Sequence, residues 1–136
     1  MSIKRLASKN DHFHLWMQKD GNLELHKKLH NNHRGNWEVI WASRTTGAGR
    51  PPYRLDLNEN TNELEIHDSY DNFVWKSRVS VSNRNNFVNG GYAILENNGN
   101  FVVYDGKNTT MWSTGTKGGH KSPAFGSGIK HESRFY

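Results

Sequence analysis

Five polar residues occupy every second position in one short segment. They are Gln18, Asp20, Asn22, Glu24 and His26. A side-chain amide offers both a donor and an acceptor, and an ionised carboxylate offers strong acceptors. On an extended chain these groups share the face opposite Leu23 and Leu25 and form a polar row. Such a row can bind the adjacent hydroxyls of a sugar; an ordinary solvated strand face is the alternative interpretation.

The segments around this row predict strands. Apolar residues at every second position, such as Phe13, Leu15 and Met17, have the two-residue period of a half-buried strand rather than the period of a helix. Asp20-Gly21-Asn22 and Asn98-Gly99-Asn100 interrupt such segments with residues that tolerate positive φ, as hairpin turns require. The sequence therefore predicts small antiparallel sheets.

One unit occurs three times along the chain: two alternating strands and then a strand centred on Trp-x-Ser/Thr. The closing residues Trp41, Trp75 and Trp112 are 34 and 37 positions apart, a period typical of a pseudo-symmetric array. A sheet of this size cannot bury a face alone, so three sheets should pack around a shared axis. We therefore predict an all-β fold with these tryptophans in its core.

The Gln18-x-Asp20-x-Asn22 segment, the strand after it and the Trp-x-Ser/Thr closures resemble the bulb-type mannose-binding lectins of the snowdrop agglutinin class. That family repeats a Gln-x-Asp-x-Asn-x-Val-x-Tyr motif. The resemblance implies a β-prism II fold of three pseudo-symmetric antiparallel sheets. It also implies a non-catalytic lectin for mannose or mannose-rich glycans, in which the polar groups contact sugar hydroxyls and the valine touches ring carbons. The lectin domain is expected to span residues 1–116.

The three copies match the motif to different degrees. The first keeps its Gln-x-Asp-x-Asn part but has Glu24 at the valine position and His26 at the tyrosine position. The third copy exchanges amide and carboxylate at the first two positions and keeps the last three. Its candidate residues are Glu96, Asn98, Asn100, Val102 and Tyr104. The second copy, with Asn58, Asn60 and His67, carries one extra residue, which a strand absorbs as a bulge or by reversing later side chains. Whether it binds stays open.

Composition limits the possible functions. The chain has 136 residues and no cysteine, which excludes disulfides and thiolate chemistry. Asp20 and Glu24 would lie roughly 13 Å apart on one strand, farther than a glycosidase carboxylate pair. The histidines lack the spacing of a zinc site. We therefore expect no catalytic residues, no metal site and no cofactor.

The net charge of +5 supports a second hypothesis. A lectin-like scaffold could bind a protein or an anionic partner through its prism faces or through a basic loop. That loop contains Lys27, Lys28, His30, His33 and Arg34. The remaining charges are scattered, so nucleic acid is not an expected partner. No segment has the length of a membrane span, and the first residues lack an apolar signal region, so we expect a cytoplasmic location or release without a signal peptide.

The C-terminal part of the chain departs from the family. Residues 117–136 begin as a Gly/Ser/Pro-rich linker and end in weak alternation, which fits either a flexible arm or an edge strand. Bulb-type lectins commonly dimerise by exchanging their C-terminal strand. The resemblance therefore implies a homodimer, with residues 111–116 as the exchanged segment.

Overall fold

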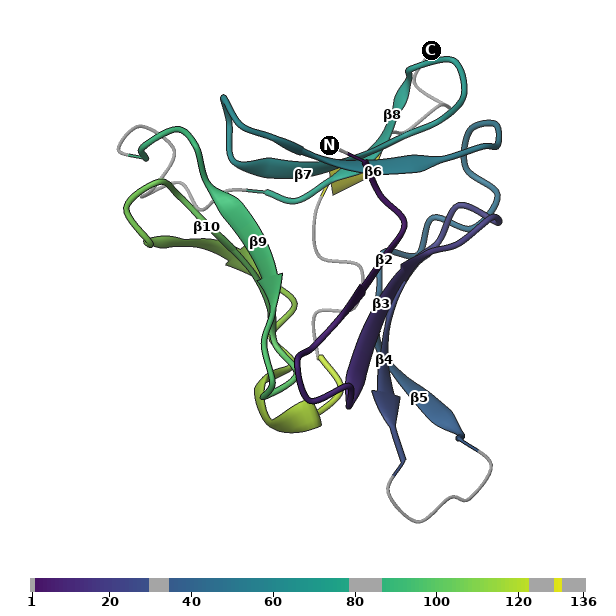
Figure 1. Ribbon diagram of the computed structural model, residues 1–136. Helices are drawn as coiled ribbons and strands as arrows, with labels where there is room; N and C mark the ends of the chain where they lie inside the picture. The colour runs from purple at the N-terminus through teal and green to yellow at the C-terminus, as the bar shows by residue number, and fades with distance from the viewer. Residues whose placement is uncertain (1, 30–34, 79–86, 123–128, 131–136) are drawn as a thin grey trace.

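The computed structural model describes residues 2–29, 35–78, 87–122 and 129–130, and these form three antiparallel sheets (Figure 1). The sheet of the first copy, in the order β2-β3-β4-β5, contains β2 (Arg5–Ala7), β3 (Phe13–Met17), β4 (Leu23–Lys28) and β5 (Trp37–Ala42). The sheet of the second copy, in the order β1-β6-β7-β8-β12, contains β1 (Ser2–Ile3), β6 (Arg54–Asn58), β7 (Glu63–His67), β8 (Phe73–Lys76) and β12 (Ile129–Lys130). The sheet of the third copy, in the order β11-β10-β9, contains β9 (Tyr92–Leu95), β10 (Phe101–Tyr104) and β11 (Thr110–Ser113).

The three sheets surround one axis, with the second copy at the top of Figure 1, the third at the left and the first at the right. Trp41, Trp75 and Trp112 meet at the centre, with ring centroids 5.8, 5.6 and 5.7 Å apart. Each pair packs edge to face, the arrangement that the charge distribution of aromatic rings favours. The predicted all-β prism with a tryptophan core is confirmed.

The hydroxyl two residues after each tryptophan ties the third strand of a copy to its second strand. Ser43 Oγ accepts a hydrogen bond from Leu23 N at 3.0 Å, and Ser77 Oγ accepts one from Leu64 N at 2.9 Å. In the third copy the hydroxyl of Thr114 accepts from Phe101 N at 3.1 Å. These buried hydroxyls satisfy backbone donors, which explains why the closures are Trp-x-Ser/Thr.

Register irregularities recur at one position in all three copies. The ladder shifts between Leu25 and His26, between Ile66 and His67, and between Val103 and Tyr104. A bulge changes the direction of the side chains beside it. In each copy the shift comes directly before the residue at the motif's tyrosine position.

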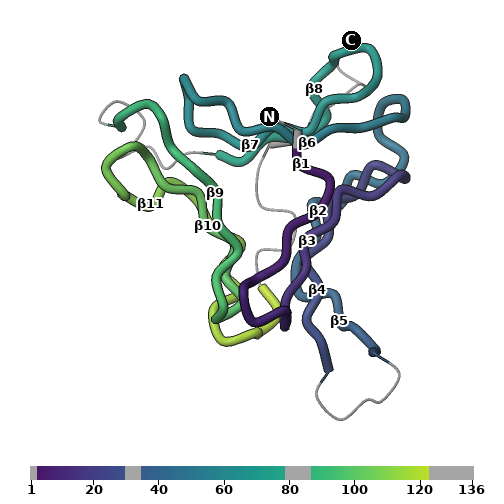
Figure 2. The backbone as a smooth tube through the Cα atoms, viewed as in Figure 1, coloured from purple at the N-terminus to yellow at the C-terminus, as the bar shows by residue number. Residues whose placement is uncertain are grey.

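The N-terminal segment contributes a further strand to two of the sheets. In Figure 2 it runs from β1, paired with β6, to β2, paired with β3. Within the described ranges no strand pairs with the outer edge of β9. Near the other end, Lys117–Gly119 forms a 3-10 turn and β12 pairs with β8. None of the described residues form a helix long and apolar enough to cross a membrane.

Candidate functional site

The outer face of each sheet carries side chains from the first and second strands of its copy. Paired outward residues are His14 with His26 and Trp16 with Glu24 in the first copy, Arg54 with His67 and Asp56 with Glu65 in the second, and Tyr92 with Tyr104 and Ile94 with Val102 in the third. The predicted polar row is therefore not one extended strand. Glu24 and His26 lie on β4, whereas the other three residues of the row lie in the hairpin at residues 18–22, which reverses the chain at Gly21, whose φ is +94°.

In the first copy, Glu24 collects the donors of its neighbours. Its carboxylate accepts hydrogen bonds from Gln18 Nε2 and Asn22 Nδ2, each at 2.8 Å. His26 Nε2 lies 2.9 Å from Glu24 Oε1, and because an ionised carboxylate only accepts, this nitrogen carries the proton. Four of the five predicted residues are thus brought together, but the donors of the other three all point at Glu24.

Asp20 lies apart from that cluster. It sits in the hairpin turn, where its Oδ1 accepts the backbone N–H of Asn22 at 2.9 Å. Its backbone oxygen accepts from Gly47 N at 2.8 Å, which fixes the turn against the next segment of the chain. Its exposed carboxylate retains a second oxygen that faces no donor among the described residues.

The second copy also has a central glutamate, but only one amide donates to it. Asn58 Nδ2 donates to Glu65 Oε2 at 3.2 Å, and His67 Nε2 lies 3.5 Å from Glu65 Oε1. The extra residue is absorbed in the turn, where buried Asn62 takes a φ of +55° and donates to Val88 O at 2.9 Å. Asn60 is exposed in this turn.

In the third copy, a valine stands where the other copies have glutamate. Val102 is buried and forms the floor of the row, and it offers no acceptor to its neighbours. Asn100 Oδ1 is anchored by Thr116 N at 3.2 Å, but no hydrogen bond from Asn100 Nδ2 reaches another described residue. Tyr104 donates its hydroxyl proton to Glu96 Oε2 at 2.9 Å. Asn98 is exposed beside them, with its Oδ1 bound to Asn100 N.

The Tyr104 phenol stays protonated at neutral pH. The hydrogen bond to Glu96, together with burial and the negative charge of that carboxylate, raises the pKa of Tyr104 above its ordinary value. The site therefore keeps a phenol oxygen that can accept a further hydrogen bond, next to a carboxylate with one oxygen left for a ligand.

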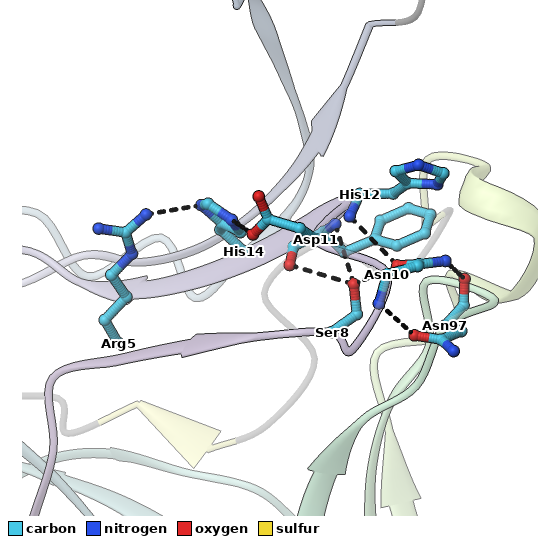
Figure 3. Close-up of polar contacts among 8 residues, drawn as sticks. Arg5, Ser8, Asn10, Asp11, His12, His14 and Asn97 are labelled. Carbon is cyan, nitrogen blue, oxygen red and sulfur yellow. Dashed lines mark hydrogen bonds and ion pairs between the residues drawn. The ribbon is translucent and has the colours of Figure 1, made fainter.

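A contact from the first copy fixes the turn of the third copy. Asn10 N donates to Asn97 Oδ1 at 2.9 Å, and Asn10 Nδ2 donates to Asn97 O at 3.1 Å (Figure 3). Asn97 lies between Glu96 and Asn98, so these bonds set the position of both candidate residues. Phe13 packs against Gly99 of the same turn so closely that an added Cβ would lie 2.6 Å from its ring.

The outer face of the first copy is further filled by its N-terminal strand. Arg5 donates to His14 Nδ1 at 3.0 Å, and His14 Nε2 lies 2.7 Å from Asp11 Oδ1 (Figure 3). The hydrogen bond from His14 lowers the pKa of the Asp11 carboxyl. The Arg5 guanidinium also lies over the ring of Trp16, 5.1 Å from its centroid. No group of three or more His, Asp or Glu side chains in the described ranges is placed to hold a metal ion.

A three-sheet prism with polar rows on its outer strand faces defines the β-prism II class of lectins. Comparison with models of known protein families and with curated proteins finds no match. Among solved structures, the Remusatia vivipara lectin is 33% identical, with 74% of each chain covered and a TM-score of 0.52. A mannose-specific lectin from Crocus vernus is 30% identical, with 84% of this chain and 87% of that chain covered and a TM-score of 0.55.

A third structure, of monomeric monocot mannose-binding lectins from Gastrodia elata, is 25% identical, with 85% of this chain and 99% of that chain covered and a TM-score of 0.60. The chain belongs to the bulb-type mannose-binding lectin family. Lectins are non-catalytic carbohydrate-binding proteins, as the sequence analysis expects of this chain.

Several residues that shape these faces were not predicted from the sequence. Glu65 completes the second closed cluster, Asn10 fixes the third turn, and Tyr92 and Ile94 flank the third row. Tyr92 and Ile94 alternate with Glu96, so the two-residue period that revealed the first row could have found them. The bond between Asn10 and Asn97 joins residues 87 positions apart and leaves no local signal. Of the basic loop, His30, His33 and Arg34 lie outside the described residues.

Proposed function

We propose that this chain binds mannose-type glycans without changing them and that the third copy is its principal site. The binding residues are Glu96, Asn98, Asn100, Val102 and Tyr104. The observation that carries the proposal is the Nδ2 donor of Asn100, which lies above the buried Val102 and donates to no other described residue. We name mannose as the ligand because Asn100, Val102 and Tyr104 match the last three positions of the family's mannose-binding motif.

The third copy matches the chemistry of neighbouring sugar hydroxyls. Each hydroxyl both donates and accepts, so a pair of them needs donors and acceptors side by side. Asn100 and Asn98 supply amide donors, while Glu96 and Tyr104 supply oxygen acceptors. Val102 closes the floor without competing for any of these groups.

The first and second copies are proposed as weaker sites. A sugar entering the first copy must displace Glu24 from Gln18, Asn22 and His26 before it can use them. A hydrogen bond to a charged group contributes about 1.5 to 3 kcal/mol, so this exchange offsets much of what the sugar would gain. The same reasoning applies to Glu65 in the second copy.

Asn100→Asp tests the proposal. The aspartate keeps the oxygen that holds Thr116 N but loses the amide donor, so affinity for methyl α-mannoside should fall about tenfold. Asn36→Asp, at an exposed position outside the three motif segments, is the matched control and should bind like the wild type. Calorimetric titration measures both. A glycan array without mannose-restricted signal would overturn the lectin proposal and favour a scaffold that binds a protein or an anionic partner.

We also propose that the protein acts as a homodimer on mannose-rich glycoproteins. One shallow site should bind a monosaccharide with a dissociation constant on the order of millimolar. Two chains that engage one branched glycan would raise avidity about 100-fold or more. Light scattering gives the oligomeric state, and a monomer with equal affinity for free mannose and glycoprotein would contradict this proposal. Within the single chain, residues 110–113 already pair with β10, and Trp112 fills the core.

A further inference from the structure

Two large apolar side chains lie exposed beside the third copy's site. Tyr92 is 42% exposed and Ile94 is 41% exposed. Both are on β9 and point to the outer face, because they pair directly with Tyr104 and Val102 of the neighbouring strand. Glu96 is at the next outward position, so the three side chains continue the binding row along the length of β9.

Tyr92 is held in place before any ligand arrives. Its ring stacks on that of Tyr104 at a centroid distance of 5.2 Å, and its hydroxyl donates to Asn108 Oδ1 at 2.8 Å. An aromatic side chain that is fixed in advance loses little conformational freedom when a ligand packs on it. Tyr92 therefore offers a ready platform for an apolar surface.

A groove continues from this row along the edge of β9. It lies between β2 and β9, has a volume of about 420 Å³, and is lined among others by Leu6, Lys9, Ile94 and Glu96. Its apolar walls and few polar groups are the usual composition of a small-molecule site. Within the described ranges, Lys9 makes no hydrogen bond or ion pair, so its ammonium group is available to hydroxyls.

The corresponding position is filled in the first copy. There Trp16 occupies the place of Ile94, and Arg5 of the paired strand β2 lies over its ring. In the second copy β1 pairs with β6 along the same edge. Among the described residues, the first strand of a copy thus has an unpaired edge only in the third copy, which also has the open polar row.

We propose that the third copy's site extends over β9 and binds glycans of at least two residues. One mannose occupies the polar row, and the ring carbons of the adjoining sugar pack on Tyr92 and Ile94, with its hydroxyls within reach of the groove and Lys9. This extension rests on the proposed function. A saccharide is the occupant because the platform is continuous with the sugar row and combines apolar faces with single polar groups.

Titration with methyl α-mannoside and with α-linked dimannosides tests the extension. The wild type should bind at least one dimannoside about five- to tenfold more tightly than the monosaccharide. Tyr92→Ala and Ile94→Ser should each reduce that ratio to about two or less while leaving monosaccharide affinity within about twofold. Tyr92→Phe, which keeps the ring, should retain the ratio. Tyr70→Ala removes a tyrosine that is 65% exposed on the second copy, and it should change neither affinity.

The outcomes separate the two proposals. Equal affinity of the wild type for monosaccharide and all dimannosides, or equal loss of both in Tyr92→Ala and Ile94→Ser, would overturn the extension and leave the proposed function standing. Binding of neither sugar would overturn both. A ratio that falls in both variants and survives in Tyr92→Phe supports the extension.

Discussion

The first and third copies share a backbone and differ in what faces outward from it. In both, an asparagine side chain is anchored through its Oδ1 to the threonine that follows the closing tryptophan strand: Asn22 to Thr45 N and Asn100 to Thr116 N, each at 3.2 Å. The two asparagines differ in the partner of Nδ2. Asn22 gives this donor to Glu24, whereas in the third copy Val102 stands at the glutamate position and the Nδ2 of Asn100 donates to no other described residue. The residue at the motif's valine position, Glu24 or Val102, therefore decides whether the asparagine donor is bound within the row (a closed row) or left for a ligand (an open row).

A glutamate that accepts a hydrogen bond from a neighbouring amide occurs in the second copy as well as in the first. Glu65 and His67 stand where the first copy has Glu24 and His26, and an amide side chain donates to the glutamate in both. The glutamate and the histidine thus replace the motif's valine and tyrosine together. A carboxylate on this face requires donors nearby, and in the first copy the histidine ring supplies one of them at 2.9 Å.

The largest expected effect comes from giving the third copy the glutamate that the other two copies have at this position. In Val102→Glu a carboxylate would stand beside Asn100 and compete for its donor, so mannoside affinity should fall about 10- to 100-fold. Calorimetry measures the loss, and thermal unfolding checks the fold because the position is buried. Val102→Thr, whose hydroxyl is too short to reach Asn100, serves as the control. Unchanged affinity in Val102→Glu would show that the open row is not the site.

Opening the first copy should have the next largest effect. Glu24→Val combined with His26→Tyr restores the family motif and frees Gln18 and Asn22. The number of mannoside sites per chain should double, and avidity for a mannose-rich glycoprotein should rise about tenfold or more. Surface plasmon resonance and calorimetric stoichiometry measure the two effects. If the double variant gains no site while its melting temperature stays within about 2 °C of the wild type, Glu24 and His26 are not what separates the first copy from the third.

A smaller effect is expected from loosening the third turn. Asn10→Asp removes the bond from Nδ2 to Asn97 O but keeps the backbone bond to Asn97 Oδ1. The loss of one neutral hydrogen bond costs about 0.5 to 1.5 kcal/mol, part of which should appear as a three- to fivefold weaker mannoside affinity. Lys107→Gln, on the exposed turn after β10, is the control. An effect on melting temperature alone would make Asn10 structural rather than a positioning residue.

The smallest effect concerns alkaline pH. The hydrogen bond to Glu96 raises the pKa of Tyr104, so the stability that this bond contributes is fully present below the ordinary phenol pKa of about 10. That contribution is lost as pH rises through the higher pKa of the folded state. Unfolding measured from pH 8 to 11 should therefore show a loss above about pH 10 that is smaller in Tyr104→Phe. Identical curves for the two proteins would contradict the role of this bond.

The strands and the core could be predicted because their signals are local. Alternating apolar residues, glycine turns and three regularly spaced tryptophans each indicate structure over a few positions. β1 and β2 gave no such signal, because strands of two and three residues are too short to show alternation. Their pairing with other sheets became visible only in the fold.

The candidate site was harder to predict because its state depends on contacts across the hairpin. The sequence shows Glu24 at a valine position, but a carboxylate there could face solvent or its neighbours. The turn at Gly21 decides this by bringing Gln18 and Asn22 from opposite sides to the same carboxylate. The first copy keeps the motif's polar triad best, and yet both amides of that triad already donate to Glu24.

The central claim is tested most directly by following two side-chain amides in one NMR titration. The Nδ2 protons of Asn22 and Asn100 give separate signals that can be assigned by single substitution. With increasing methyl α-mannoside, the Asn100 signals should shift and saturate, while the Asn22 signals should stay in place. Saturating shifts at Asn22 with none at Asn100 would contradict the assignment of the third copy as the open site.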